Sequence, residues 1–200
     1  MLDKKQLQEL LLQSLEHERG GVTVYQTALE SASCEDLKKE WTKYLSQTRK
    51  HVQILEGVLQ KFEIDPEQET AGREVVRSLG EALVRAMKKA QGAGDPAAAQ
   101  LVACECVVIA ETKDHADWEL IGKCAESLDG DAAAAMMAAY EKIEDEEDEH
   151  LYHSKGWCRE LWLKSLGLKA VLPPPEEQRD VKSAVEAAQA KEDMEPARKH

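Results

Sequence analysis

A run of six consecutive acidic residues, Glu144 to Glu149, is followed by histidines at positions 150 and 153 in the sequence EDEEDEHLYH. A run of like charge is normally the solvated surface of a helix. Carboxylates and imidazoles are also the oxygen and nitrogen ligands that iron, manganese and zinc accept in proteins. The chemistry of this segment therefore depends on which of its acids, if any, face the interior.

The helices that position these residues are marked by their ends. Ala, Glu, Lys, Leu and Gln dominate the 200-residue chain, and an alternation typical of strands is absent, which predicts an all-α protein. Pro66 interrupts the pattern, Asp95 and Pro96 give a strong helix start, and Ser33 is a candidate N-cap. The predicted helices cover about 3–31, 35–62, 73–91, 96–128 and, after a DGD turn, residues up to about 165.

Four of these helices are long and form two hairpins. They are joined by a long connection that carries the shorter helix, 73–91, which predicts an antiparallel four-helix bundle with one crossover. We expect the bundle domain to cover 1–168. The polar remainder, 169–200, is expected to be a C-terminal tail that is partly disordered or loosely helical near 180–191.

The interior of such a bundle is read from positions alternately three and four residues apart. Each long helix has apolar or aromatic residues at both ends of this seam and polar residues in its middle. The polar seam residues are Glu18, Thr48, His51, Glu111, His115, Glu147 and His150. Within the acidic run, Glu147 is predicted to point inward, whereas its neighbours lie outside or at the boundary. Antiparallel packing would bring the polar middle segments of the four helices to the same level in the bundle. Protonation, hydrogen bonds or a metal must then compensate the buried charges.

This pattern resembles the ferritin-like di-iron carboxylate superfamily, which includes ferritins, bacterioferritins, rubrerythrins and manganese catalases. In that family two helices each supply one Glu and two supply Glu-x-x-His. The segment EDEH at 147–150 matches one such motif, and TRKH at 48–51 falls at the position of the other. The resemblance implies the metal ligands Glu18, His51, Glu111, Glu147 and His150, with His115 as a further imidazole and Glu144 as a possible additional ligand.

Thr48 departs from the family pattern, which has a metal-bridging Glu at this position. A neutral hydroxyl cannot replace a bridging carboxylate. The site could therefore be asymmetric, hold one metal rather than two, or use His115 or Glu144 in compensation. Because Thr48 and Gly122 are small residues near the expected metal level, we also predict an opening there.

The resemblance implies iron as the cofactor, di-iron or mononuclear, with manganese and zinc as alternatives. It implies a reaction with dioxygen or peroxide that serves metal handling or protection against oxidative stress, as in a ferroxidase- or peroxidase-like oxidoreductase. Thr48 favours a different class, a non-enzymatic interaction or stress protein with a degenerate metal centre. A transferase or oxygenase on the same bundle, with an organic substrate, is a third interpretation.

Composition restricts the partners and the compartment. A net charge of −13 argues against nucleic acid as the main partner and is compatible with attracting cations. Five cysteines without a C-x-x-C motif, together with the lack of a signal peptide or a membrane-length apolar run, predict a cytoplasmic protein with free thiols. The apolar stripe of the helix at 73–91 either covers the bundle or supplies the surface of a homodimer.

Overall fold

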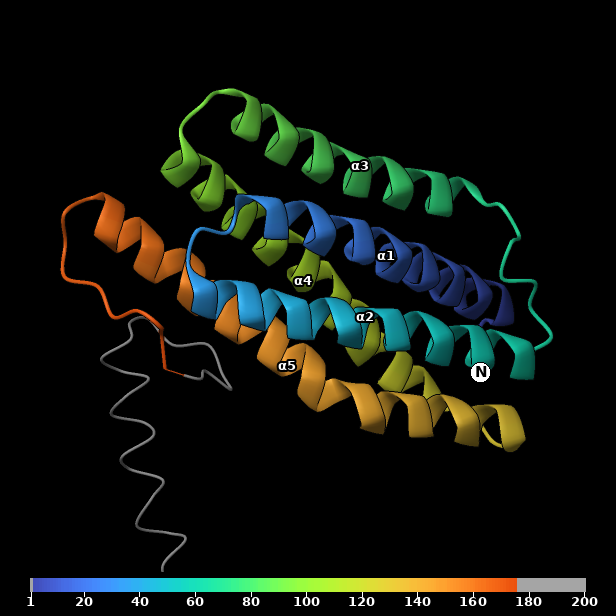
Figure 1. Cartoon of the computed structure of the whole chain (residues 1–200). Helices are drawn as coiled ribbons and strands as arrows, with labels where there is room; N and C mark the ends of the chain where they lie inside the picture. Colours follow the sequence, from blue (N-terminus) through green and yellow to red (C-terminus); the bar gives the residue numbers. More distant parts are fainter. Residues whose placement is uncertain (1, 176–200) are drawn as a thin grey trace, which may run out of the picture.

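The computed structural model describes residues 2–175, and this part of the chain is all-helical, with five helices and no strand. The helices are α1 (Lys4–Ser31), α2 (Glu35–Lys61), α3 (Ala71–Gly92), α4 (Pro96–Glu126) and α5 (Asp131–Ser165), as Figure 1 shows. The all-α prediction is confirmed, and the predicted helix ends lie within two residues of those observed. The helix predicted near 180–191 lies outside the described residues.

Local capping explains why the helices begin where they do. The side chain of Asp3 accepts hydrogen bonds from the backbone N–H groups of the first turn of α1, and Asp95 does the same for α4. Pro96 occupies the first position of α4, where its missing N–H costs nothing. The sequence signals therefore act locally, through backbone donors that no intrahelical partner satisfies.

The start of α2 differs from the prediction. Its N-cap is Cys34 rather than Ser33, and Cys34 makes no side-chain cap bond. Ser33 instead donates its backbone N–H, at 2.7 Å, and its hydroxyl, at 2.8 Å, to Oε1 of Gln100 on α4. The hydroxyl that was expected to cap α2 is used to tie the α1–α2 turn to α4.

Four helices enclose the interior of the bundle. α1 packs against α2 and α4, and α5 packs against the same two helices, whereas α3 contacts α1 and α4 from outside (Figure 1). Two apolar clusters occupy this interior, one containing Trp41 and Trp157 and the other containing Leu11, Leu55 and Ile143. The apolar ends of the four helices thus pack into two apolar clusters, and the polar residues in the middle of each helix lie between these clusters.

The crossover helix α3 covers one side of the bundle. Val76 and Met87 are buried, but Val75 and Leu79 on the same helix are 59% and 56% exposed. The start of α3 is fixed by Arg73, which is 1% exposed and bonds Oε2 of Glu16 through Nε at 3.1 Å and Nη2 at 2.7 Å. The apolar stripe of this helix is therefore only partly used to cover α1 and α4.

Residues after α5 fold back toward the helix. The backbone N–H of Val171 donates to Oε2 of Glu160 at 2.8 Å, and Leu172 packs against one of the apolar clusters. The five cysteines are free, as expected. None of the helices described for residues 2–175 has the length and apolar character needed to cross a membrane.

Candidate metal centre

Five buried side chains converge between the two apolar clusters. They come from all four enclosing helices: Glu18 on α1, His51 on α2, Glu111 on α4, and Glu147 and His150 on α5. Each is at most 3% exposed. Their ligand atoms form two groups within which all atoms lie within 4.8 Å of one another: Glu18, His51 and Glu147 in the first, and Glu111, Glu147 and His150 in the second.

The carboxylate of Glu147 belongs to both groups. Its Oε1 lies 3.1 Å from Nδ1 of His51 and 3.5 Å from Nδ1 of His150. The same Nδ1 of His51 is 3.5 Å from Oε1 of Glu18, and Nδ1 of His150 is 3.5 Å from Oε2 of Glu111. Both imidazoles thus direct the same nitrogen toward the shared carboxylate.

The atoms that face one another in this cluster approach to 3.1–3.5 Å, but none of them forms a hydrogen bond within residues 2–175. They are Oε2 of Glu18, Oε2 of Glu111, both carboxylate oxygens of Glu147, and Nδ1 of His51 and His150. Buried polar atoms in proteins are almost always hydrogen-bonded, because desolvation without a partner is costly. Three carboxylates and two imidazoles without a thiolate are a donor set that fits iron, manganese or zinc. The cluster therefore meets the chemical requirements of a metal site.

The outward-facing atoms of the same residues are held by neighbours. Nε2 of His51 is 2.8 Å from Oε2 of Glu146, and Nε2 of His150 is 3.1 Å from Oε1 of Gln47. Because both acceptors are oxygens, each Nε2 carries a proton and Nδ1 is the nitrogen available to the site. The indole N–H of Trp118 donates to Oε1 of Glu18 at 2.8 Å. This arrangement orients the imidazoles as metal ligands are usually oriented.

Glu146 and Gln47 were not identified from the sequence. Glu146 was expected to lie outside or at the boundary, and its side chain is 35% exposed, yet it bonds a buried imidazole. Gln47 lies beside the seam of α2 and is 8% exposed. A residue next to a seam position carries no pattern of its own, so only the contact across to a neighbouring helix reveals its role.

Burial and mutual charge set the protonation of the cluster in the absence of a metal. Burial raises the pKa of Glu18 to about 7, even though His51 and Trp118 act in the opposite direction. Burial would also raise the pKa of Glu147, but His150 and His51 outweigh it and lower this pKa to about 2. For His150, burial lowers the pKa, but Glu111 and Glu147 outweigh it and raise the pKa to about 9. A metal bound through Nδ1 of His150 would therefore have to displace a proton from this imidazole.

The predicted residue His115 does not join the cluster. Its Nε2 bonds Oδ1 of Asp148 at 2.7 Å, and its side chain is 16% exposed. The interior position one turn after Glu111 is taken instead by Asp114, which is 4% exposed and whose Oδ1 forms no hydrogen bond with the described residues. Burial, followed by the charge of Glu147, raises the pKa of Asp114 well above its usual range. The sequence pattern placed His115, four residues after Glu111, in the seam. Asp114 could have been found instead from its three-residue spacing to Glu111, which equals the spacing from Glu147 to His150.

Glu144 and the expected opening are also placed differently. Glu144 accepts a hydrogen bond of 2.5 Å from the hydroxyl of Tyr140 and belongs to neither group. The ring of Tyr140 lies so close to Gly122 that an added Cβ would be 2.8 Å away, so the small residue there makes room for a ring rather than an opening. Thr48 is buried, and its hydroxyl donates to the backbone oxygen of Tyr44 at 2.9 Å.

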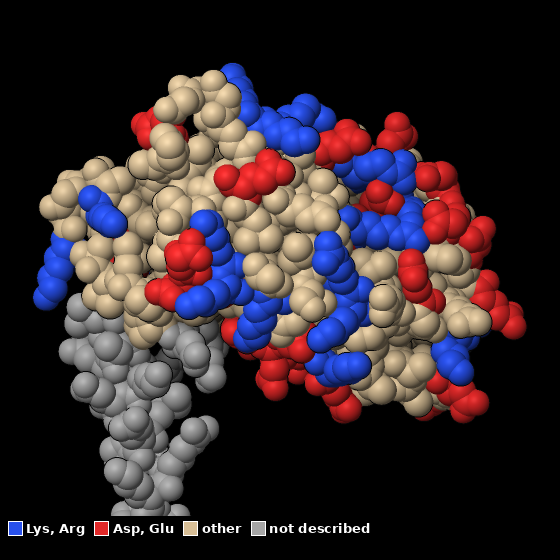
Figure 2. All heavy atoms as spheres, in the orientation of Figure 1, with Lys and Arg blue, Asp and Glu red and all other residues tan. Residues whose placement is uncertain are grey.

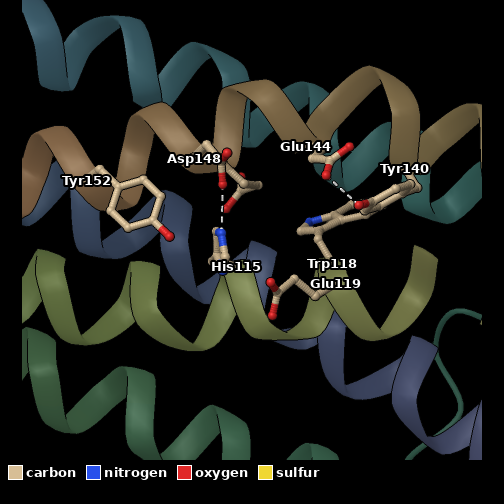
Figure 3. A pocket seen from close by; sticks show the side chains of 8 residues that line it. His115, Trp118, Glu119, Tyr140, Glu144, Asp148 and Tyr152 are labelled. Atoms are coloured by element: carbon tan, nitrogen blue, oxygen red, sulfur yellow. Dashed lines mark hydrogen bonds and ion pairs between the residues drawn. The ribbon is translucent and has the colours of Figure 1, made fainter. Parts of the chain in front are cut away.

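A cavity of about 190 Å³ lies instead between α4 and α5. Figure 3 shows His115 pointing toward Asp148, and Tyr140 beside Glu144, around this pocket. Glu147 also lines it, so the pocket borders the buried cluster at the residue that both groups share.

Comparison of the chain with family models, with curated proteins and with solved structures finds no match in any of the three. The donor set and its geometry are therefore the basis on which a function can be assigned.

Proposed function

We propose that this protein is a ferritin-like metalloprotein that binds iron, or alternatively manganese or zinc, between α1, α2, α4 and α5. The observation that carries the proposal is the carboxylate of Glu147. Two Glu/His groups share it, and neither of its oxygens is hydrogen-bonded to any of the described residues, although Nδ1 of His51 lies 3.1 Å from Oε1. A positively charged ligand would satisfy the inward-facing donor atoms at once, whereas a buried network left in this condition would be costly.

The packing supports a ferritin-like, antiparallel four-helix arrangement. The chain directions in Figure 1 alternate between α1 and α2 and between α4 and α5, and the long connection from α2 to α4 carries α3. Contacts of α1 with α4 and of α2 with α5 close the bundle. Such a bundle builds metal sites from side chains that project inward from facing helices.

Each residue of the cluster would have a separate role in holding the metal. Glu18 with His51 would hold one side of the site and Glu111 with His150 the other, with Glu147 between them. Iron or manganese bound there would supply electron transfer to dioxygen or peroxide. Around it, the two apolar clusters exclude water, and the outward hydrogen bonds of the imidazoles keep each Nδ1 directed into the site.

The test is metal content. The purified protein is stripped with chelator, reloaded with Fe²⁺ under anaerobic conditions or with Mn²⁺ or Zn²⁺, desalted and measured by mass spectrometry. We expect stoichiometric metal and a raised thermal midpoint, because a ligand that binds only the folded state stabilises it. Consumption of dioxygen or peroxide by the iron-loaded protein then tests the reaction.

The matched variants are Glu147→Ala and Glu141→Ala. Glu141 is an exposed acid on the same helix, so its loss changes the net charge equally without touching the cluster. We expect Glu147→Ala to lose the metal and Glu141→Ala to retain it. Equal metal content in the two variants would contradict the proposal.

One observation favours the second candidate, a non-enzymatic bundle with a degenerate centre. Thr48 occupies the place of a bridging carboxylate, and its hydroxyl is used by the backbone of its own helix. A wild-type protein that takes up no iron, manganese or zinc, and whose thermal midpoint none of them shifts, would support this candidate.

A further inference from the structure

Given the proposed function, on which this inference rests, a cation must reach a cluster whose members are almost fully buried. We propose that the pocket between α4 and α5 is the channel through which a divalent cation reaches the site, and that the acids lining it form an outer cation station. The five-residue cluster described above contains none of these acids except Glu147, so the channel and the station add further residues to the site.

The connection between pocket and cluster is made by Glu147. It lines the pocket, it is 1% exposed, and neither of its carboxylate oxygens has a hydrogen-bond partner in the part of the chain that the structure describes. Of the five cluster residues, it alone lines this pocket. A cation that crosses the pocket would therefore meet Glu147 before any other residue of the cluster.

The charge of the pocket suits a cation. Glu119 from α4 and Glu144 and Asp148 from α5 line it together with Glu147, and within the described part of the chain no Lys or Arg lines it. By contrast, the face of the molecule in Figure 2 carries Lys and Arg interspersed with Asp and Glu. A cleft lined by one sign of charge concentrates the field and raises the local concentration of counter-ions.

The pocket is also large enough. Its volume of about 190 Å³ compares with a share of about 30 Å³ for each water molecule in the liquid. A divalent ion could therefore occupy it with part of its hydration shell and exchange those waters for carboxylate oxygens in steps. A second cavity, of about 230 Å³ between α1, α3 and α4, is lined mainly by apolar residues such as Val24 and Leu79 and by none of the five cluster residues.

Two hydrogen bonds hold the acids of the outer station in place. His115 reaches across from α4 to Asp148 on α5, and Tyr140 holds Glu144 within α5 (Figure 3). The other oxygen of each carboxylate is not used in these bonds, so both side chains keep a donor atom for a passing cation. His115, which the sequence suggested as a ligand of the buried site, is thus assigned to the channel as a residue that positions Asp148.

The experiment measures the rate of uptake separately from the amount bound. Co²⁺ is mixed with the chelator-stripped protein in a stopped-flow instrument, and quenching of tryptophan fluorescence is followed, since Trp118 contacts both the pocket and Glu18. The final metal content is then measured by mass spectrometry. The variants are Glu119→Lys at the pocket and Glu141→Lys, an equal charge change at another exposed position.

We expect Glu119→Lys to slow uptake by about tenfold or more at low ionic strength and Glu141→Lys to slow it by less than about twofold, with unchanged final metal content in both. Added salt should reduce the difference, because it screens exposed charges. Asp148→Asn, which keeps the shape of the side chain, should also slow uptake and leave the final content unchanged.

The outcomes separate the two proposals. If the wild type loads fully but Glu119→Lys and Glu141→Lys take up Co²⁺ at the same rate, the channel is wrong and the metal site stands. If the wild type binds no Co²⁺, Fe²⁺, Mn²⁺ or Zn²⁺, the proposed function is wrong and the channel with it. A Glu119→Lys variant that loads slowly but completely would support both.

Discussion

The two sides of the buried cluster offer the same kinds of donor atom but are held by different neighbours. We call Glu18 with His51 the His51 half, and Glu111 with His150 the His150 half. In the His51 half, the imidazole bonds a carboxylate, Glu146, and Glu18 accepts the indole N–H of Trp118. In the His150 half, the imidazole bonds the neutral amide of Gln47. Oε2 of Glu111, like Oε2 of Glu18, has no hydrogen-bond partner among the described residues.

The two halves therefore offer the same types of ligand atom, but the charge of the group behind each imidazole differs. A carboxylate that accepts from the distal nitrogen makes an imidazole a stronger electron donor than an amide does. Glu18 is also held in one orientation before a metal arrives. We therefore expect the His51 half to bind a metal more tightly than the His150 half.

The largest effect should come from removing one carboxylate of each half. Glu18→Gln and Glu111→Gln each remove one charged donor and leave the shared Glu147 in place. If the site holds two ions, each variant should retain about one, and the ion retained by Glu111→Gln should be the tighter. Titration calorimetry with Mn²⁺ measures both stoichiometry and affinity. Equal remaining affinities in the two variants would contradict the asymmetry.

The next effect should come from exchanging the outward acceptors. Glu146→Gln replaces the carboxylate behind His51 by an amide and should weaken Mn²⁺ binding by about tenfold, which is the usual range for such partners. Gln47→Glu places a carboxylate behind His150 and should strengthen the weaker half. The two substitutions reverse each other's charge change, so opposite shifts in affinity support the comparison and shifts of the same sign would break it.

The pH dependence of the chelator-treated protein sharpens the comparison further. The pKa of His150 is raised from 6.5 to about 9, so its contribution to stability is complete below about pH 6.5 and is lost as the pH rises through about 9. The pKa of His51 is raised to about 11, so its contribution is lost at still higher pH. The thermal midpoint should therefore fall between pH 6.5 and 9, and less steeply in His150→Gln. A midpoint that rises across this window would show that these imidazoles are not the groups that titrate.

The smallest effects should separate the two residues that follow Glu111. His115→Asn should leave the affinity for Mn²⁺ within about twofold of the wild type, because His115 lies outside both groups. Asp114→Asn should lower the affinity by a few fold, because it removes a buried carboxyl group whose ionisation a bound cation would favour. Titration of both variants checks this order. If His115→Asn lowered the affinity for Mn²⁺ more than Asp114→Asn does, His115 would have to be a ligand of the buried site.

Much of this protein could be predicted from the chain alone because the relevant forces are local. Asp3, Asp95 and Pro96 define helix starts through backbone groups a few residues away. Helical periodicity also assigned Glu18 and Glu147 to the interior, because each lies at the three- and four-residue spacing of the apolar seam positions along its own helix. These features need no knowledge of the neighbouring helices.

Tertiary structure decided the rest, for a geometric reason. With 3.6 residues per turn, positions three and four residues on deviate from the starting direction by about 60° and 40° to opposite sides. Either Asp114 or His115 could therefore follow Glu111 into the interior, and only the place of α5 beside α4 turns His115 toward Asp148. The acceptors Glu146 and Gln47 likewise acquire their roles only when α2 and α5 come into contact.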